Sequence, residues 1–175
     1  MTFDDPALPG LQGKRWLTAA EKRAWLGLCG SMRLIDEAID DDLHIGDALS
    51  HSDYQILAML SAAPEHRLRM STLAEVVFVS RSRLTYQVTQ LEQRGLVRRE
   101  DFPSDRRGQV AVLTGAGLAV LQAAAPGHVA SVRRVFFDLL TEEQVAVLGD
   151  AFSAIIARAL KDRERELLAA LWAGQ

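Results

Sequence analysis

The sequence has few of the residues that mark secreted, zinc-bound or membrane-spanning proteins. Its 175 residues include one cysteine, Cys29, which excludes an intrachain disulfide framework and a multi-cysteine zinc site. No apolar run approaches the ~18 residues that a bilayer span needs. Asp4 and Asp5 stand where a signal peptide would carry basic residues. We therefore expect a cytoplasmic protein with one domain-sized core and no membrane association.

Patterns typical of enzymes are also missing. The four histidines have no metal-ligand spacing, and no Ser/His/Asp group or carboxylate pair stands out. Gly115-Ala-Gly117 follows an apolar run and mimics a dinucleotide fingerprint. However, Val120 takes the place of the third glycine, and no further parallel-strand unit follows. We expect no catalysis, no cofactor and no metal.

The charge is distributed unevenly along the chain. Residues 66–110 hold nine arginines against five acids, a net charge of +4, whereas the whole chain has a net charge of −3. A basic middle between acidic ends is typical of a segment that binds a polyanion, although a solvated charged surface gives the same count. Arginine also offers a planar fork that suits phosphate and guanine.

The spacing of apolar residues predicts a long first helix over about residues 18–43. Thr18 and Glu21 have the spacing of a capping box at its start. The helix ends in Asp40, Asp41 and Asp42, and acids oppose the helix dipole at this end. We therefore expect a solvated end.

Between residues 50 and 114 the pattern predicts three short helices and a β-hairpin. The helices are expected to begin after Ser50 or Ser52, at Ser71 and after Ser80, with an extended piece at 67–70, a left-handed cap at Gly95, and hairpin strands at 96–101 and 109–113. The connection 102–108 is expected to be a long basic tip. The fold class is therefore mainly α with a small β-hairpin wing, a winged helix-turn-helix DNA-binding domain joined to a helical dimerisation region.

Beyond the hairpin, Thr114 caps an alanine-rich helix toward Pro126 that resumes after it, and Thr141 with Gln144 opens a final helix. The outer helices carry large apolar side chains that a small winged domain cannot bury alone, which favours a homodimer. These are Trp16, Trp25, Phe136, Phe137, Leu139, Leu140, Phe152 and Trp172. The expected organisation is a flexible arm at 1–15, a dimerisation helix at 16–48, the DNA-binding domain at 50–114 and dimerisation helices at 115–175.

The helix that begins after Ser80 has the features of a DNA-recognition helix. Arg81 and Arg83 lie in its first turn, where the helix dipole disfavours cations, so stability does not explain them but a major groove does. The candidate contacts are Ser80, Arg81, Ser82, Arg83, Thr85, Tyr86 and Gln87 on this helix, Asp105, Arg106 and Arg107 on the wing, and Arg69 and Ser71 on the DNA backbone. Arg106 or Arg107 would enter a minor groove, with Asp105 as a brace.

Four blocks resemble the MarR family of bacterial transcription regulators. They are Leu68–Ala74, Ser80–Thr85, Leu91–Arg99, and Asp105–Gly108 leading to Val112-Leu113-Thr114. The resemblance covers about residues 20–160. It implies a homodimer with intertwined first and last helices, most often a repressor, that binds double-stranded DNA at a palindromic operator. A small-molecule or oxidant signal often releases the DNA.

The position of the effector pocket in that family suggests a lining of Trp25, Cys29, Met32, His51 and Tyr54. Ordinary core packing is the alternative for each of them. Cys29 is expected to be a small buried residue, with a redox-sensing thiol as the alternative. The second interpretation of the whole chain is a winged-helix protein–protein interaction module without specific DNA binding.

Overall fold

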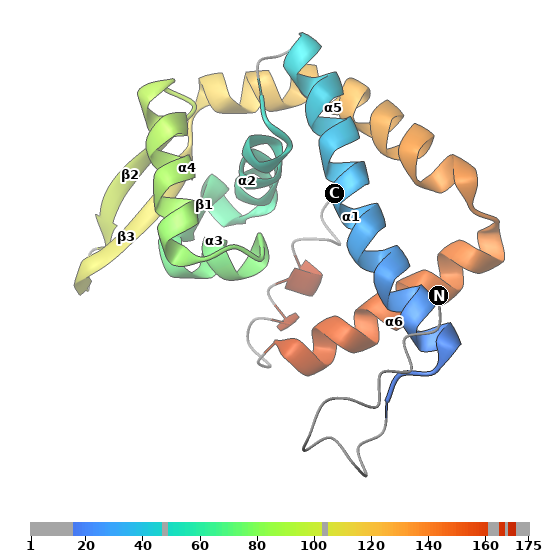
Figure 1. Cartoon of the computed structure of the whole chain (residues 1–175). Helices are drawn as coiled ribbons and strands as arrows, with labels where there is room; N and C mark the ends of the chain where they lie inside the picture. Colours follow the sequence, from blue (N-terminus) through green and yellow to red (C-terminus); the bar gives the residue numbers. More distant parts are fainter. Residues whose placement is uncertain (1–15, 47–48, 103–104, 161–164, 167, 171–175) are drawn as a thin grey trace, which may run out of the picture. The chain divides into compact units, whose positions relative to one another are not determined.

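The computed structural model describes residues 16–46, 49–102, 105–160, 165–166 and 168–170, with the side chains of 44–46, 102 and 105–107 left out. The elements follow one another as α1 (Ala19–Gly46), α2 (His51–Ala62), β1 (Arg67–Arg69), α3 (Met70–Val76), α4 (Arg81–Gln93), β2 (Val97–Phe102), β3 (Asp105–Leu113), α5 (Gly115–Val135) and α6 (Glu142–Ala159) (Figure 1). Short 3₁₀ turns lie at Pro64–His66 and Phe137–Leu139. The chain divides into two compact units, 1–34 and 35–175.

The larger unit is built around a three-stranded antiparallel sheet in the order β1-β3-β2. Strand β3 pairs Ala111 with Leu68 of β1 and with Arg99 of β2. Helices α2, α3 and α4 pack against this sheet and against one another. The fully buried side chains between them include Ile56, Leu73, Leu84, Val88 and Leu91. The predicted fold class, mainly α with a winged helix-turn-helix, is confirmed.

Local hydrogen bonds fix where the helices begin. The capping boxes predicted at Thr18 and Thr141 are present, and Ser50 rather than Ser52 caps α2. Helix α4 begins after Ser80, whose hydroxyl accepts from the Arg83 N–H at 3.3 Å. Helix α3 begins at Met70, one residue before the predicted start. Because each cap involves residues three apart, the sequence is sufficient to predict it.

The end of α1 is exposed at Asp41 and Asp42, in line with the solvated end that we expected, but Asp40 and Asp42 also have partners in the fold. Asp40 accepts from the backbone N–H of His51 at 2.5 Å, and Asp42 binds the Ser131 hydroxyl and the Arg134 guanidinium. These hydrogen bonds, from Ser131 first and Arg134 second, lower the pKa of Asp42. The sequence did not predict these hydrogen bonds because the partners lie on α2 and α5, up to 92 residues away in sequence.

The wing and α5 also differ in detail from the prediction. Strand β3 begins at Asp105, which pairs with Phe102, so Asp105, Arg106 and Arg107 belong to a strand and not to a long tip. The pairing of β2 with β3 continues through an irregularity at Asp101/Phe102. It therefore reaches residues that the sequence pattern had assigned to the connection between the strands. Helix α5 is continuous through Pro126, whereas we expected an interruption there. The arm 1–15 lies outside the described residues.

Glycine 117 lies where α5 meets the hairpin. A Cβ at this position would stand 2.1 Å from the carbonyl oxygen of Leu96 and 2.8 Å from the Leu113 side chain. The Leu96 carbonyl also accepts from the Thr114 N–H, and the Thr114 hydroxyl accepts from the Gly117 N–H. The Gly115-Ala-Gly117 pattern is therefore a close helix–hairpin contact, and the neighbouring sheet is antiparallel, not the parallel sheet of a dinucleotide fold.

Candidate nucleic-acid interface

The predicted recognition helix α4 is held with one face in the core. Leu84, Val88 and Leu91 are buried, as the sequence predicted. The helix ends at Arg94, and Gly95 follows with a φ of +72°, the predicted left-handed cap. The opposite face exposes six of the seven candidate contacts, which are Ser80, Arg81, Ser82, Arg83, Thr85 and Tyr86.

The seventh candidate, Gln87, is buried. It is 8% exposed, and its Oε1 has no hydrogen-bond partner. Helical geometry explains this burial, because residue 87 is three positions after Leu84 and next to Val88, both of which face the core. The prediction that Gln87 presents its amide to DNA is therefore wrong for this conformation.

Four of the nine arginines of the basic segment are paired with carboxylates. Arg67 and Arg98 both bind Glu100, with N···O distances of 3.0 and 2.6 Å. Arg94 binds Asp53 at 3.2 Å. These residues come from different elements, so the ion pairs join β1, β2, α2 and the end of α4. Their positive charge is largely compensated inside the protein.

Arg99 makes the most complete of these contacts. Its Nε and Nη2 atoms donate to Glu92 Oε2 at 2.9 and 2.5 Å, and its backbone N–H donates to Glu92 Oε1 at 2.9 Å. The guanidinium hydrogen bonds, followed by the backbone one, lower the pKa of Glu92. Glu92 lies on α4 and Arg99 on β2, so this pair fixes the wing relative to the recognition helix.

Arg81 and Arg83 differ from these arginines. Both are exposed, and within the described part of the chain no carboxylate pairs with either side chain. They stand in the first turn of α4, beside the N–H groups that the Ser80 cap leaves unsatisfied. Positive side chains at the positive end of a helix dipole, without a counter-ion, are not explained by helix stability and stay the predicted contacts for an external anion.

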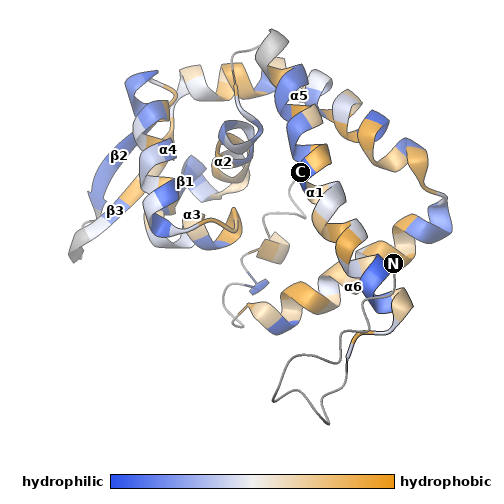
Figure 2. Cartoon of the chain, in the orientation of Figure 1, coloured by the Kyte–Doolittle hydropathy of each residue, from blue (hydrophilic) through white to orange (hydrophobic). Residues whose placement is uncertain are grey.

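The remaining predicted DNA contacts are less defined. Arg69 is exposed at the end of β1, and Ser71 is half-buried in the first turn of α3. Asp105, Arg106 and Arg107 lie at the start of β3, but their side chains are outside the described set. Figure 2 shows hydrophilic residues along β2, the outer strand of this hairpin.

The five residues predicted to line an effector pocket have different surroundings. Trp25 and Met32 are 58% and 63% exposed, and Cys29 is exposed, so the expectation of a buried thiol was wrong. These three lie in the 1–34 unit, on the first part of helix α1. The grouping of all five in one pocket stays a prediction.

His51 and Tyr54, in the larger unit, contact His128, which no sequence pattern singled out. The rings of Tyr54 and His128 stack with a centroid distance of 3.9 Å, and His51 lies 5.5 Å from His128. Asp36 accepts a hydrogen bond from His51 Nδ1 at 2.5 Å. Burial, and then the neighbouring His51, lower the pKa of His128 to about 4, and burial raises the pKa of Tyr54.

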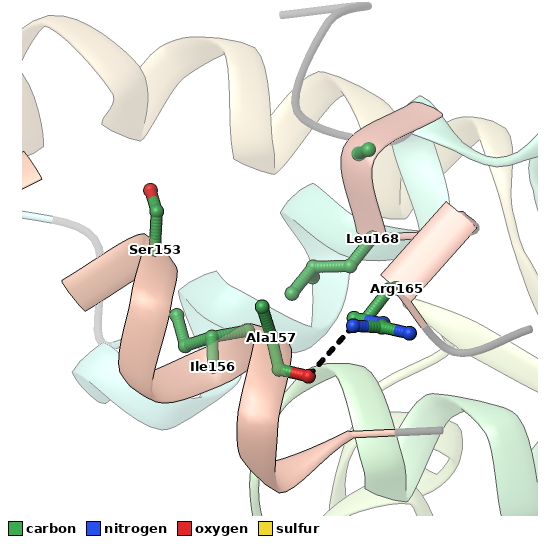
Figure 3. A pocket seen from close by; sticks show the side chains of 6 residues that line it. Ser153, Ile156, Ala157, Arg165 and Leu168 are labelled. Carbon is green, nitrogen blue, oxygen red and sulfur yellow. Dashed lines mark hydrogen bonds between the residues drawn. The ribbon is translucent and has the colours of Figure 1, made fainter. Parts of the chain in front are cut away.

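A separate hollow of about 230 Å³ lies on α6 (Figure 3). Ser153, Ile156 and Ala157 line it together with Leu168, and Arg165 donates to the Ala157 carbonyl at 2.9 Å. None of the predicted pocket residues lines this hollow. Among the described residues, no cluster of three or more His, Cys, Asp or Glu side chains is arranged to bind a metal, and no helix is long and apolar enough to cross a membrane.

Comparison with known proteins places this geometry in a family. The sequence model of the MarR family matches residues 49–108. The HTH-type transcriptional repressor YetL of Bacillus subtilis (strain 168) is 32% identical over 113 residues, which are 63% of this chain and 68% of YetL.

Two solved structures of MarR family regulators from Streptomyces coelicolor are also similar. Sco3205, solved in complex with DNA, is 40% identical with a TM-score of 0.78, over 85% of this chain and 96% of that chain. AbsC is 44% identical with a TM-score of 0.75, over 83% of this chain and 98% of that chain. This chain therefore belongs to the MarR family, and it is a DNA-binding transcriptional regulator and not an enzyme.

Proposed function

We propose that this regulator is a homodimeric repressor that binds a palindromic operator, with α4 in the major groove and the β2–β3 hairpin in the minor groove. The observation that carries the proposal is the pair of exposed, uncompensated arginines, Arg81 and Arg83, at the start of α4. Four other arginines of the basic segment, Arg67, Arg94, Arg98 and Arg99, are paired internally with Glu92, Glu100 and Asp53. Positive charge is thus concentrated where a helix can enter a groove.

The individual contacts follow from exposure. Arg81 and Arg83 would bind guanine edges or phosphates. The hydroxyls of Ser80, Ser82 and Thr85 and the phenol of Tyr86 would supply further hydrogen bonds. Arg106 or Arg107 on β3 would enter the minor groove, with Asp105 beside them, while Arg69 and Ser71 would contact the DNA backbone.

Dimerisation is supported by apolar surface outside the winged domain. Helix α6 has no buried residue, although apolar residues recur along its length (Figure 2). Large side chains that are at least 39% exposed lie at both ends of the described chain: Trp16, Trp25, Leu26, Met32, Phe137, Leu139, Val147 and Ile155. A second copy would cover them. We therefore assign 16–48 and 115–175 to dimerisation and 50–114 to DNA binding.

Two-fold symmetry then sets the form of the operator. A dimer presents two copies of α4, and these would read inverted half-sites about 10 bp apart, centre to centre. The relative YetL is named a transcriptional repressor, which supports repression as the effect of this regulator on transcription. Binding to chromosomal DNA would place the protein in the cytoplasm.

A small-molecule effector completes the proposal. His51, Tyr54 and His128 offer stacked rings, and the His128 Nδ1 atom is buried without a hydrogen-bond partner in the described structure. An unpartnered buried nitrogen can accept or donate to a bound molecule. A compound that binds there should release the operator, and the change in tyrosine fluorescence on its addition is the measurement.

The test of the DNA-binding proposal is fluorescence anisotropy with the intergenic DNA beside the gene, against a scrambled duplex. A specific regulator should prefer its site by ~10³ or more. Alanine at Arg81 or at Arg83 should each weaken binding by about 1–3 kcal/mol. Arg133→Ala on α5, which removes the same charge from a 65% exposed site, is the matched control. Equal affinity for both duplexes, and equal affinity of the Arg81 and Arg133 variants, would favour the protein-interaction module instead.

A further inference from the structure

The turn between α3 and α4 holds a phenylalanine in a backbone conformation that favours glycine. Phe78 has a φ of +56°. Its N–H donates to the Glu75 carbonyl at 3.2 Å, and the next N–H, of Val79, donates to the Ala74 carbonyl at 3.0 Å. This pair of bonds is a Schellman motif that closes α3, and its left-handed position is usually glycine because a Cβ crowds the backbone there. The backbone therefore gives no reason for phenylalanine.

Packing gives no reason for it either. Val77 and Val79, on both sides of Phe78, are half-buried and pack on the core, so they anchor the turn. Phe78 itself is 57% exposed. A single exposed apolar residue is common on protein surfaces. An exposed aromatic residue that also occupies an unfavourable left-handed position is not, and it points to a use outside the folded chain.

The position of Phe78 indicates that use. It lies two residues before Ser80, the cap of α4, and three before the uncompensated Arg81. The apolar group that B-DNA offers in its major groove is the C5 methyl of thymine, and phenylalanine is one of the side chains that contact it. Arg81 and Arg83 can read only acceptor groups, so a thymine reader would add information that they cannot supply.

We propose that Phe78 contacts a thymine methyl in the major groove and gives the operator half-site a thymine preference next to the bases read by Arg81. This inference rests on the proposed DNA-binding mode of α4. It assigns base reading to the turn that precedes the helix. Losing one buried methyl contact corresponds to about a fourfold loss of affinity per half-site.

The experiment compares thymine with deoxyuracil, which lacks only the methyl group. The operator is first selected from random duplexes with the wild-type protein, and is then synthesised with deoxyuracil at every thymine. Binding of both duplexes is measured for wild type, Phe78→Gly and Phe78→Leu. Phe78→Gly suits the left-handed backbone, so it should fold and melt at or above the wild-type temperature. Glu65→Gly is the matched control, since Glu65 is also exposed with a φ of +53° but lies before β1.

The expected result is that wild type, Phe78→Leu and Glu65→Gly prefer the thymine duplex, while Phe78→Gly binds it more weakly and no longer distinguishes the two. Equal thymine preference in wild type and Phe78→Gly would overturn the inference and leave the proposed function standing. Weaker binding by Phe78→Gly with an unchanged preference would also overturn it, because the contact would then be with sugar or phosphate. Failure of the wild type to select any sequence would overturn the proposed function itself and this inference with it.

Discussion

The contact between Gly117 and the Leu96 carbonyl allows a worked prediction for Gly117→Ala. The added Cβ would lie 2.1 Å from the Leu96 oxygen, whereas ordinary contact begins near 3.4 Å, so α5 or the hairpin must move by more than about 1 Å. The same oxygen accepts from the Thr114 N–H and from the Thr114 hydroxyl, each at 3.1 Å, and movement weakens both bonds.

The magnitude follows from these contributions. Overpacking costs about 1–3 kcal/mol and each weakened hydrogen bond up to about 1 kcal/mol, while alanine regains up to about 1 kcal/mol of helix propensity. We expect the free energy of unfolding to fall by about 2–4 kcal/mol. For a chain of this size the melting temperature should fall by roughly 4–16 °C.

Urea denaturation followed by circular dichroism measures this change, at one protein concentration because dimerisation would couple to stability. Gly127→Ala is the matched control, since Gly127 lies in the same helix with nothing within 4 Å of its Cβ position. That substitution should stabilise the protein by about 0.5–1 kcal/mol. A Gly117→Ala protein as stable as Gly127→Ala would refute the close approach of α5 to the hairpin.

Three further predictions concern groups that the fold buries or pairs. Gln87→Met should raise the free energy of unfolding by about 1 kcal/mol in urea denaturation, because it removes a buried oxygen without a partner; a selective loss of operator affinity instead would show that the amide reaches DNA. The pKa of His128 is about 4 in the folded protein against 6.5 when exposed, so the unfolded chain takes up a proton first as the pH falls. The free energy of unfolding should therefore decrease as the pH drops from 6.5 to 4, by at most about 1.4 kcal/mol per pH unit. His128→Phe keeps the stacking on Tyr54, and its stability, followed by thermal melts across this range, should decline less than that of wild type; equal declines would contradict the burial of a neutral imidazole. Glu92→Gln should weaken the clamp on Arg99 and increase amide hydrogen exchange in β2, and unchanged exchange would show that the pair does not hold the wing.

Short-range features of the fold follow from the sequence because their causes lie within four residues. The cap at Ser80, the capping box at Thr141 and the left-handed Gly95 each depend on a local hydrogen bond or backbone angle. The spacing of Leu84, Val88 and Leu91 likewise predicted the buried face of α4. One local feature was not predicted: Phe78 belongs to an apolar run that is typical of core residues, yet it is exposed with a positive φ.

Long-range features could not be predicted in the same way. The hairpin was expected from its strands, yet the start of β3 at Asp105 depends on pairing across the turn, which composition does not specify. Tyr54 and His128 are 74 residues apart in sequence, and only the packing of α2 with α5 stacks them. The nine arginines of residues 66–110 correctly predicted a net positive charge for this segment. They did not show which of these arginines are free of carboxylates, because the ion pairs join residues from different elements.

By itself, then, the sequence determined the order of the elements, the fold class, and the helix that carries Arg81 and Arg83, because periodicity and capping act over a few residues. The tertiary structure alone decided which arginines are compensated, that Gln87 faces the core, that Asp42 has partners on α5, and that a Cβ at position 117 would collide with the Leu96 carbonyl. Each of these features depends on contacts between residues that are distant in sequence. The path of the folded chain decides which of those residues meet and which are buried together.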